Sequence, residues 1–192
     1  MGEPTATKTD DYGHCAHWRH ERTGDRCHGV LAELYHRGSD RCGRKILYFS
    51  AYGTADYDGN GLEGLIDGRG SGLMWHGDYA YAYNDPTYGQ YIDIALDSSI
   101  SHFAYSLWTR YENANGAPVT THIYASTDGS TWHLIGIVSN EFTEGDEEYD
   151  SGVFSYREPY NYVRIAVTES NAGSVTATGG YWNCGELEIY GQ

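Results

Sequence analysis

Three short stretches of the sequence combine aromatic rings with polar side chains that can form paired hydrogen bonds. An aromatic face packs well against the C–H face of a pyranose, and planar amide or guanidinium groups bond its hydroxyls. These residue types therefore suit the binding of a sugar. The stretches contain His76 and Tyr79, then Trp108, Arg110 and Tyr111, and finally Tyr181, Trp182 and Asn183.

The five tryptophans are expected to differ in exposure. Trp182 lies in a glycine-rich loop, whereas a core tryptophan usually sits within a strand. We therefore predict that Trp182 is an exposed platform for a sugar ring and that Arg110 bonds the sugar hydroxyls. We expect Trp75 and Trp132 to lie in the core, and Arg164 to pair with an acidic neighbour.

No catalytic motif is found in the sequence. It contains no Gly-x-Ser-x-Gly elbow, no His-Glu-x-x-His helix and no phosphate-binding loop. Glycoside hydrolysis needs two carboxylates about 5 to 10 Å apart, but a chain with 27 Asp and Glu residues contains such pairs by chance. We predict that the protein is not an enzyme.

Charge and composition narrow the classes of partner. The formal net charge of −15 argues against nucleic acid or an anionic membrane as the main partner, because both require a basic face. No apolar run is long enough to insert into a membrane.

The 19 tyrosines and 25 glycines suit an extracellular all-β protein with many turns. We expect the protein to be secreted or displayed on a cell surface. The first residues do not resemble a signal peptide, so we expect any signal and any neighbouring domains of a larger multidomain protein to lie outside this sequence.

The elements that must position these residues are short strands separated by turns. Apolar residues alternate in residues 90–96, 101–108 and 162–167, and Asp128-Gly129 predicts a tight turn. No long helical segment separates the strands, so the pattern predicts an antiparallel sandwich or barrel. The alternation places Ile92, Ile94 and Leu96 on one face and sets Phe103, Tyr105 and Leu107 on the face opposite Ala104, Ser106 and Trp108. It predicts that Val163, Ile165 and Val167 are buried.

The amino-acid composition of the chain changes near residue 45. Residues 1–45 form a segment rich in histidine and cysteine, which we predict to be an appendage of a sandwich that spans residues 46–192. Within the segment, Val30, Leu31, Leu34 and Tyr35 show the spacing of one short helix.

The four cysteines are expected to form disulfides, and four cysteines permit three pairings. We favour Cys27 with Cys42 and Cys15 with Cys184, although the sequence leaves the connectivity open. A zinc site is the alternative, but no Cys-x-x-Cys spacing supports it.

Five motifs in order resemble the discoidin-like family, also called the coagulation factor V/VIII C-type family. The resemblance covers about residues 46–191. It is carried by Asp67-Gly68 followed by Trp75, by residues 91–94, by Arg110 with Asn115-Gly116 and the hairpin of residues 123–132, by residues 162–165, and by residues 186–191.

The resemblance implies an all-β, antiparallel jelly-roll β-sandwich of about eight strands that binds ligands in loops at one end. Members include galactose-binding-like carbohydrate-binding modules, lectins, and domains that bind lipids or proteins, so the fold leaves the ligand open. Because the loops carry residues suited to sugars, we predict a non-catalytic glycan-binding module. The alternative is a protein–protein or cell-adhesion domain on the same fold.

The resemblance also implies a structural calcium ion. In the family, the Asp of the Asp-Gly motif and the Glu that opens the last strand commonly share this ion, and here they are Asp67 and Glu186. Backbone carbonyls of Gly64 and of the loop that ends at Gly72 would complete an oxygen shell. Gly72 stands where the family usually has threonine, and the spacing to Trp75 is one residue longer, so Asp67 capping its own turn is the alternative.

Overall fold

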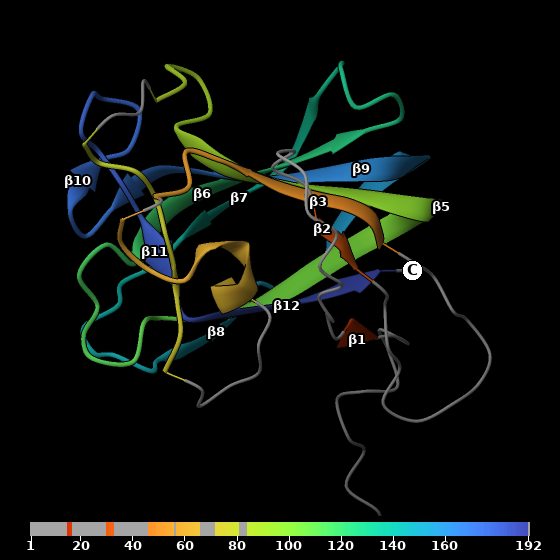
Figure 1. The fold of residues 1–192 in the computed structure, drawn as a ribbon. Helices are drawn as coiled ribbons and strands as arrows, with labels where there is room; N and C mark the ends of the chain where they lie inside the picture. Colours follow the sequence, from red (N-terminus) through yellow and green to blue (C-terminus); the bar gives the residue numbers. More distant parts are fainter. Residues whose placement is uncertain are drawn as a thin grey trace, which may run out of the picture.

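The protein is an antiparallel β-structure in which strands pair across long distances in the sequence (Figure 1). The structure, a computed structural model, describes residues 15–16, 30–32, 46–55, 57–65, 72–80 and 84–191. Within these ranges there is one 3₁₀ helix, η2 (Gly61–Leu65), and no α-helix. The strands are β1 (Cys15–Ala16), β2 (Val30–Ala32), β3 (Ile46–Tyr52), β4 (Trp75–His76), β5 (Gln90–Trp108), β6 (Pro118–Ser126), β7 (His133–Ser139), β8 (Glu148–Asp150), β9 (Phe154–Ser170), β10 (Gly173–Ser174), β11 (Asn183–Cys184) and β12 (Glu186–Gly191).

Strands β5 and β9 are long enough to take part in two layers. The first half of β5 pairs with β3 on one side and with β9 on the other. The second half of β5 pairs with β12 and β8. Figure 1 shows β5 running along the upper layer beside β3 and returning in the lower layer beside β12. The predicted antiparallel β-sandwich is confirmed, and β5 and β9 connect its two layers.

The sequence alternation places apolar side chains between the layers. Ile92 and Ile94 of β5 and Ile165 of β9 are fully buried, and Val163 and Val167 are buried as predicted. The face formed by Phe103, Tyr105 and Leu107 is buried with them. Ile92 also stands opposite Ile165 in the β5–β9 register. The buried apolar side chains form one contiguous core, whose removal from water is the main favourable contribution to folding.

The outer face of the sheet carries a different cluster around Arg164. Its guanidinium donates two hydrogen bonds to the Asp93 carboxylate, at 2.7 and 2.8 Å, as predicted for an acidic neighbour. The guanidinium also lies 3.7 Å from the ring centroid of Tyr91 and 4.2 Å from that of Trp132. Trp132 is therefore half-buried on this outer face and not in the core, whereas Trp75 is fully buried as predicted.

Two pieces of the N-terminal 45 residues pair with the sandwich. Strand β1 pairs with β12, and β2 pairs with β3. Val30–Ala32 is thus a strand, and the helix predicted from the spacing of Val30 and Leu31 is wrong at these residues, because pairing with β3 overrides local periodicity. Leu34, Tyr35 and the histidines of this segment lie outside the described residues, and the domain boundary near residue 45 stays a prediction.

The predicted disulfide between Cys15 and Cys184 is not formed. Cys184 is a free, buried cysteine, and its thiol lies 3.0 Å from the carbonyl oxygen of Glu186. The backbone of Cys15 pairs opposite Tyr190, six residues further along the chain than Cys184. The pairing of β1 with the far part of β12 therefore keeps the two cysteines apart. Cys27 and Cys42 lie outside the described residues.

Among the described residues, the structure contains no helix with the length and apolar composition needed to cross a bilayer.

Candidate functional site

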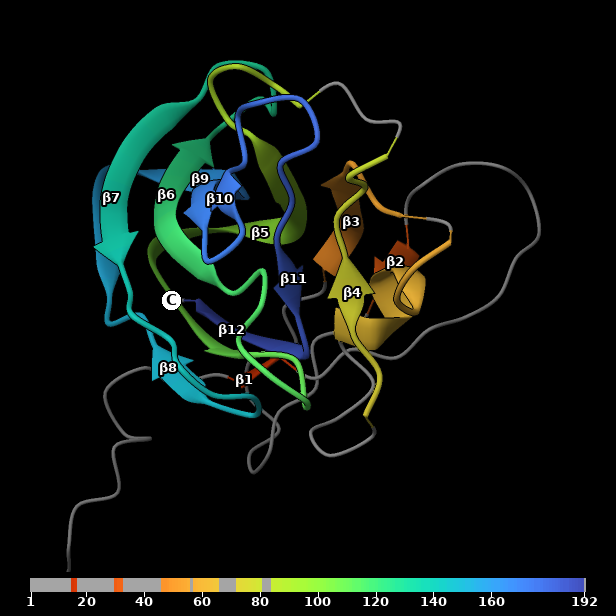
Figure 2. The same ribbon diagram turned by 90° about the vertical axis from the view of Figure 1, so that its left-hand side faces the viewer.

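Four segments meet at one end of the sandwich, which we call the loop end (Figure 2). They are the turn at residues 57–60, residues 75–80 that begin with β4, the loop at residues 109–117, and residues 176–183 that lead into β11. The backbone joins them, because Asn183 pairs with His76 and Ala55 donates a hydrogen bond to the His76 carbonyl. Strand β4 is thus held between the turn on one side and β11 on the other.

His76 forms the buried floor of the loop end. Its Nδ1 lies 2.7 Å from the carbonyl oxygen of Gly77. Because a carbonyl only accepts hydrogen bonds, Nδ1 carries a proton. The other ring nitrogen, Nε2, faces the Asp58 carboxylate at 3.8 Å. In the neutral imidazole, Nε2 is therefore a hydrogen-bond acceptor directed toward an acidic side chain.

Two tyrosines pack against His76, and a third packs against one of them, in what we call the aromatic cluster, which consists of Tyr57, His76, Tyr79 and Tyr181. The Tyr181 ring stacks on the imidazole with centroids 4.9 Å apart, and Tyr79 lies 5.4 Å from the imidazole and 5.3 Å from Tyr181. Tyr57 meets Tyr79 edge to face at 5.3 Å. Tyr79 is 40% exposed and Tyr57 is 47% exposed, so the cluster presents ring surface to solvent.

The hydroxyls of the exposed tyrosines of the cluster are held by carboxylates. Tyr79 donates to Asp58 Oδ2 at 3.3 Å, and Tyr57 donates to Asp78 Oδ1 at 2.7 Å. Desolvation and the nearby carboxylate raise the pKa of both phenols, Asp58 acting on Tyr79 and Asp78 on Tyr57. Both phenols therefore stay protonated and remain donors at neutral pH, so the two carboxylates fix the orientation of the rings.

An asparagine borders the cluster on the side of the β5–β6 loop. The Asn115 side-chain oxygen accepts a hydrogen bond from the Tyr181 hydroxyl at 3.4 Å, and its backbone carbonyl accepts one from Asn183 Nδ2 at 2.8 Å. The next residue, Gly116, has φ of 79°, and a Cβ there would lie 2.4 Å from Asn183 Nδ2 and 2.9 Å from the Tyr181 ring. Glycine is required here because the loop backbone packs directly on Tyr181.

A cavity beside the aromatic cluster, which we call the Arg110 cavity, adjoins the turn that carries Asp58. Its volume is about 240 Å³. Arg110 Nε donates to Asn113 Oδ1 at 2.9 Å, and the same oxygen accepts the backbone N–H of Asn115. The Arg110 cavity is therefore connected to the aromatic cluster through the β5–β6 loop. Its lining residues are Gly59, Asn60, Gly72, Met74, Arg110, Tyr111 and Glu112.

The structure corrects the prediction that Trp182 is an exposed platform. Trp182 is 0% exposed, its ring centroid lies 4.6 Å from that of Trp75, and its Nε1 donates to the carbonyl oxygen of Gln90 at 3.2 Å. Side chains alternate between faces in an extended segment, so Tyr181 faces the loop end while Trp182 points into the core. Asn183 and Trp108 are also buried and support the site from beneath.

Three of the predicted residues, His76, Tyr79 and Tyr181, come together in the aromatic cluster, while Arg110 and Tyr111 line the adjoining cavity. Tyr57 and Asp58 were missed by sequence reasoning. The only signal for them is a turn-rich stretch, Tyr57-Asp58-Gly59-Asn60, which resembles many surface turns. Tyr81 and Tyr83, which follow Tyr79 in the sequence, lie outside the described residues.

The predicted calcium ligands are only partly described, because Asp67 lies outside the described residues. Glu186 is a buried carboxylate at the start of β12, and η2, which carries Gly64, contacts β12. A carboxylate beside a backbone carbonyl is the kind of oxygen donor set that calcium prefers. Gly72 is exposed, with φ of 76°. The described residues contain no group of three His, Cys, Asp or Glu that suits a metal ion, so calcium stays a prediction.

Comparison with known proteins identifies the architecture. No family model matches the sequence, and no curated protein matches it. Among solved structures, one similar to this chain is CBM32-3 from a family 31 glycoside hydrolase of Clostridium perfringens, with 20% identity, 78% of this chain and 91% of that chain covered, and a TM-score of 0.58.

The chain has the fold of family 32 carbohydrate-binding modules. A second similar structure is the C. perfringens module CpGH89CBM32-5 in complex with GalNAc-β-1,3-galactose, with 18% identity, 77% and 94% coverage, and a TM-score of 0.55. A third is the family 32 module of C. perfringens NanJ in complex with galactose, with 18% identity, 74% and 91% coverage, and a TM-score of 0.51. At these identities the likeness concerns the fold.

Proposed function

We propose that the chain is a non-catalytic glycan-binding module and that the loop end is its binding site. The observation that carries the proposal is the aromatic cluster, in which Tyr79 and Tyr181 flank a buried His76. Exposed ring faces beside fixed hydrogen-bonding groups are the combination that holds a pyranose. The two carboxylates and Asn115 orient the tyrosines before a ligand arrives, which lowers the entropic cost of binding.

Each group has a distinct role in this proposal. The exposed ring of Tyr79 and the half-buried ring of Tyr181 pack against the C–H face of the sugar. Asp58 and Asn115 accept hydrogen bonds from sugar hydroxyls, and Arg110 donates to the next sugar unit in the adjoining cavity. The site thus has an apolar wall and a polar rim.

We propose a neutral galactose-type sugar as the ligand. Two solved structures with this fold contain galactose or GalNAc-β-1,3-galactose. The aromatic cluster contains no lysine or arginine, and the chain carries a net charge of −15. Sialylated, sulfated or uronic acid ligands would therefore meet like charge, which disfavours their binding.

The module is proposed to act outside the cell as part of a larger protein. Similar modules come from glycoside hydrolases such as a family 31 enzyme. Attached to such an enzyme or to an adhesin, the module would keep its parent protein close to the glycan and so raise the local concentration of substrate.

A protein–protein or cell-adhesion role is the second candidate. Strand β7 ends the sheet order, and its apolar residues Leu134 and Ile137 are exposed. Exposed apolar side chains on an edge strand can pack against another protein. Leu134→Asp should abolish an interaction of this kind without affecting the loop end.

A glycan array followed by calorimetry with galactose tests the proposed function. We expect binding of neutral glycans with terminal galactose-type units, competition by free galactose, and no cleavage of the bound glycan. Absence of binding to every glycan on the array by the folded protein would overturn the proposal. A module that released a shortened glycan would contradict its non-catalytic character.

A further inference from the structure

Asp58 has a carboxylate that the fold leaves largely unused. Its Oδ2 accepts the Tyr79 hydroxyl at 3.3 Å and lies 3.8 Å from His76 Nε2. Within the described part of the chain these are its polar contacts, and no lysine or arginine forms an ion pair with it. The side chain is 36% exposed. A charged oxygen, Oδ1, is therefore available to a ligand at the edge of the aromatic cluster.

Asp58 and His76 together form a pair of facing acceptors. His76 Nδ1 donates to the Gly77 carbonyl, so Nε2 of the neutral ring presents a lone pair toward Asp58. At 3.8 Å the two groups are too far apart for a hydrogen bond between them. A ligand group with several N–H donors satisfies both acceptors at once, whereas a hydroxyl has only one proton to donate.

The surrounding rings favour a positive charge at the same point. The face of an aromatic ring attracts a cation within about 6 Å of its centroid, and the ring centroids of Tyr79 and Tyr181 lie 5.4 and 4.9 Å from that of the His76 imidazole. The phenols of Tyr57 and Tyr79 are neutral and occupied with Asp78 and Asp58. The net charge of −15 attracts cations to the whole surface.

From this arrangement we propose that the site prefers a hexosamine with a free, protonated amine over the N-acetylated or neutral sugar, and that Asp58 determines this preference. The proposal rests on the proposed function, because the sugar ring packs on Tyr79 and Tyr181. The ammonium group lies between Asp58 and His76 and donates to both. An acetamide at this position carries no charge and has a single N–H, so it leaves one acceptor unsatisfied.

Calorimetry on the wild-type protein at pH 7 and low salt, where an ordinary imidazole is mostly neutral and the amine is still mostly protonated, compares galactosamine, N-acetylgalactosamine and galactose, together with the corresponding glucose series. We expect the free amine to bind about five- to tenfold more tightly than the neutral sugar, as for a charge-assisted hydrogen bond at a partly exposed carboxylate. The preference should shrink at high salt. It should disappear at pH 9, because amines of this kind lose their proton near pH 8.

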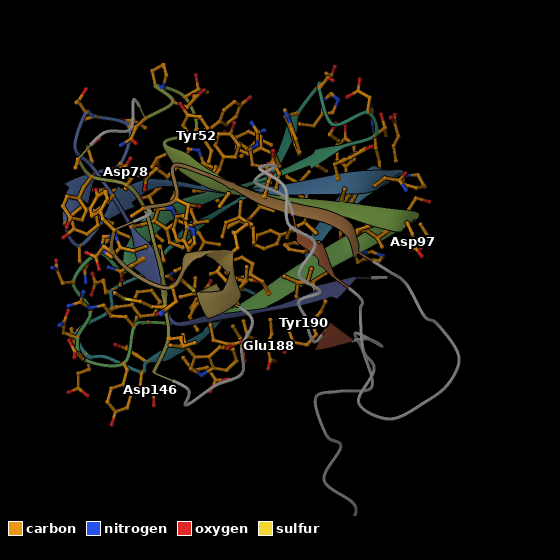
Figure 3. All side chains as sticks on the ribbon, viewed as in Figure 1. Tyr52, Asp78, Asp97, Asp146, Glu188 and Tyr190 are labelled. Carbon is orange, nitrogen blue, oxygen red and sulfur yellow. The ribbon has the colours of Figure 1, made fainter. Side chains whose placement is uncertain are left out.

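Two matched variants locate the effect. Asp58→Asn should weaken binding of the free amine more than binding of the neutral sugar, so that the two affinities become equal. Asp97→Asn removes the same charge from an exposed residue at the other end of the sandwich (Figure 3) and should keep the preference. Equal affinity of the wild-type protein for amine and neutral sugar would overturn this inference and leave the proposed function standing. Absence of binding by all of these sugars would contradict the proposed function itself.

Discussion

The Tyr181 ring lies over the His76 imidazole with centroids 4.9 Å apart and planes inclined by 27°. The two residues are separated by more than 100 positions in the sequence, and the pairing of β4 with β11 brings them together. Tyr181 is also held by its hydrogen bond to Asn115. The central ring of the site is thus fixed by contacts from two different loops.

Replacing Tyr181 with alanine should weaken glycan binding about tenfold or more, because stacking on an aromatic ring contributes about 1–3 kcal/mol. Titration calorimetry with the best glycan from the array measures the change. Tyr52→Ala is the control, since Tyr52 is also a tyrosine stacked on an aromatic ring but lies against Tyr91 of the outer sheet face. Equal losses in both variants would argue against a specific role of Tyr181.

Replacing Trp182 with alanine should destabilise the fold by about 3–5 kcal/mol, because it opens a cavity beside Trp75 and removes a buried hydrogen bond. Guanidinium denaturation measures the loss. Tyr111→Ala, at a residue that is 69% exposed, should change stability by less than about 0.5 kcal/mol. A Trp182→Ala protein of normal stability that no longer bound glycans would return Trp182 to the binding site.

Asp128 should titrate with a pKa of about 2, because the backbone N–H groups of Thr131 and Ser130 and the hydroxyl of Ser126 bond its carboxylate. The pKa is lowered in the folded state, so the contribution to stability is present above pH 3.8 and is lost as the pH falls toward 2. Carboxyl-carbon NMR measures the midpoint. Asp128→Asn should remove this part of the acid dependence, and a midpoint near 4 would contradict the role of the turn.

Chelation should lower the melting temperature if calcium links Asp67 with Glu186. An ion that binds only the folded state adds about 2.7 kcal/mol when its free concentration is 100 times the dissociation constant. Glu186→Gln should abolish the effect of EDTA. Glu188→Gln, two residues further along β12 (Figure 3), should preserve it. Identical melting curves with and without EDTA in the wild-type protein would count against the ion.

The Cys184 thiol should resist labelling in the native protein at pH 8. Burial raises its pKa, and the reactive thiolate therefore does not form. In denaturant without reductant, two thiols should react if Cys27 and Cys42 are joined, and Cys184→Ser should leave one. Four reactive thiols would exclude that disulfide. Because the thiol pKa is raised on folding, Cys184 should also make the protein lose stability as the pH rises above 9.0, its ordinary value.

Much of the fold was predictable because each long strand has its own two-residue alternation. The alternation of Ile92, Ile94 and Leu96 marks one face of β5 without knowledge of its partners, and all three are buried. The Asp128-Gly129 turn was equally local, and Gly129 has φ of 70°. What alternation could not show is that β5 and β9 each run through both layers, since a bend within a strand leaves little trace in residue types.

The sequence by itself predicted a β-sandwich and singled out His76, Tyr79 and Tyr181 as residue types suited to a sugar, and the structure brings these three together. Only the tertiary structure decided which of Tyr181 and Trp182 faces the loop end, since both precede β11, and a strand of two residues is too short for an alternation to be recognised. Pairing with β4 turns Tyr181 outward and Trp182 inward. Asp58 likewise joins the site only because the chain folds its turn against His76, and such long-range contacts depend on packing that no local pattern records.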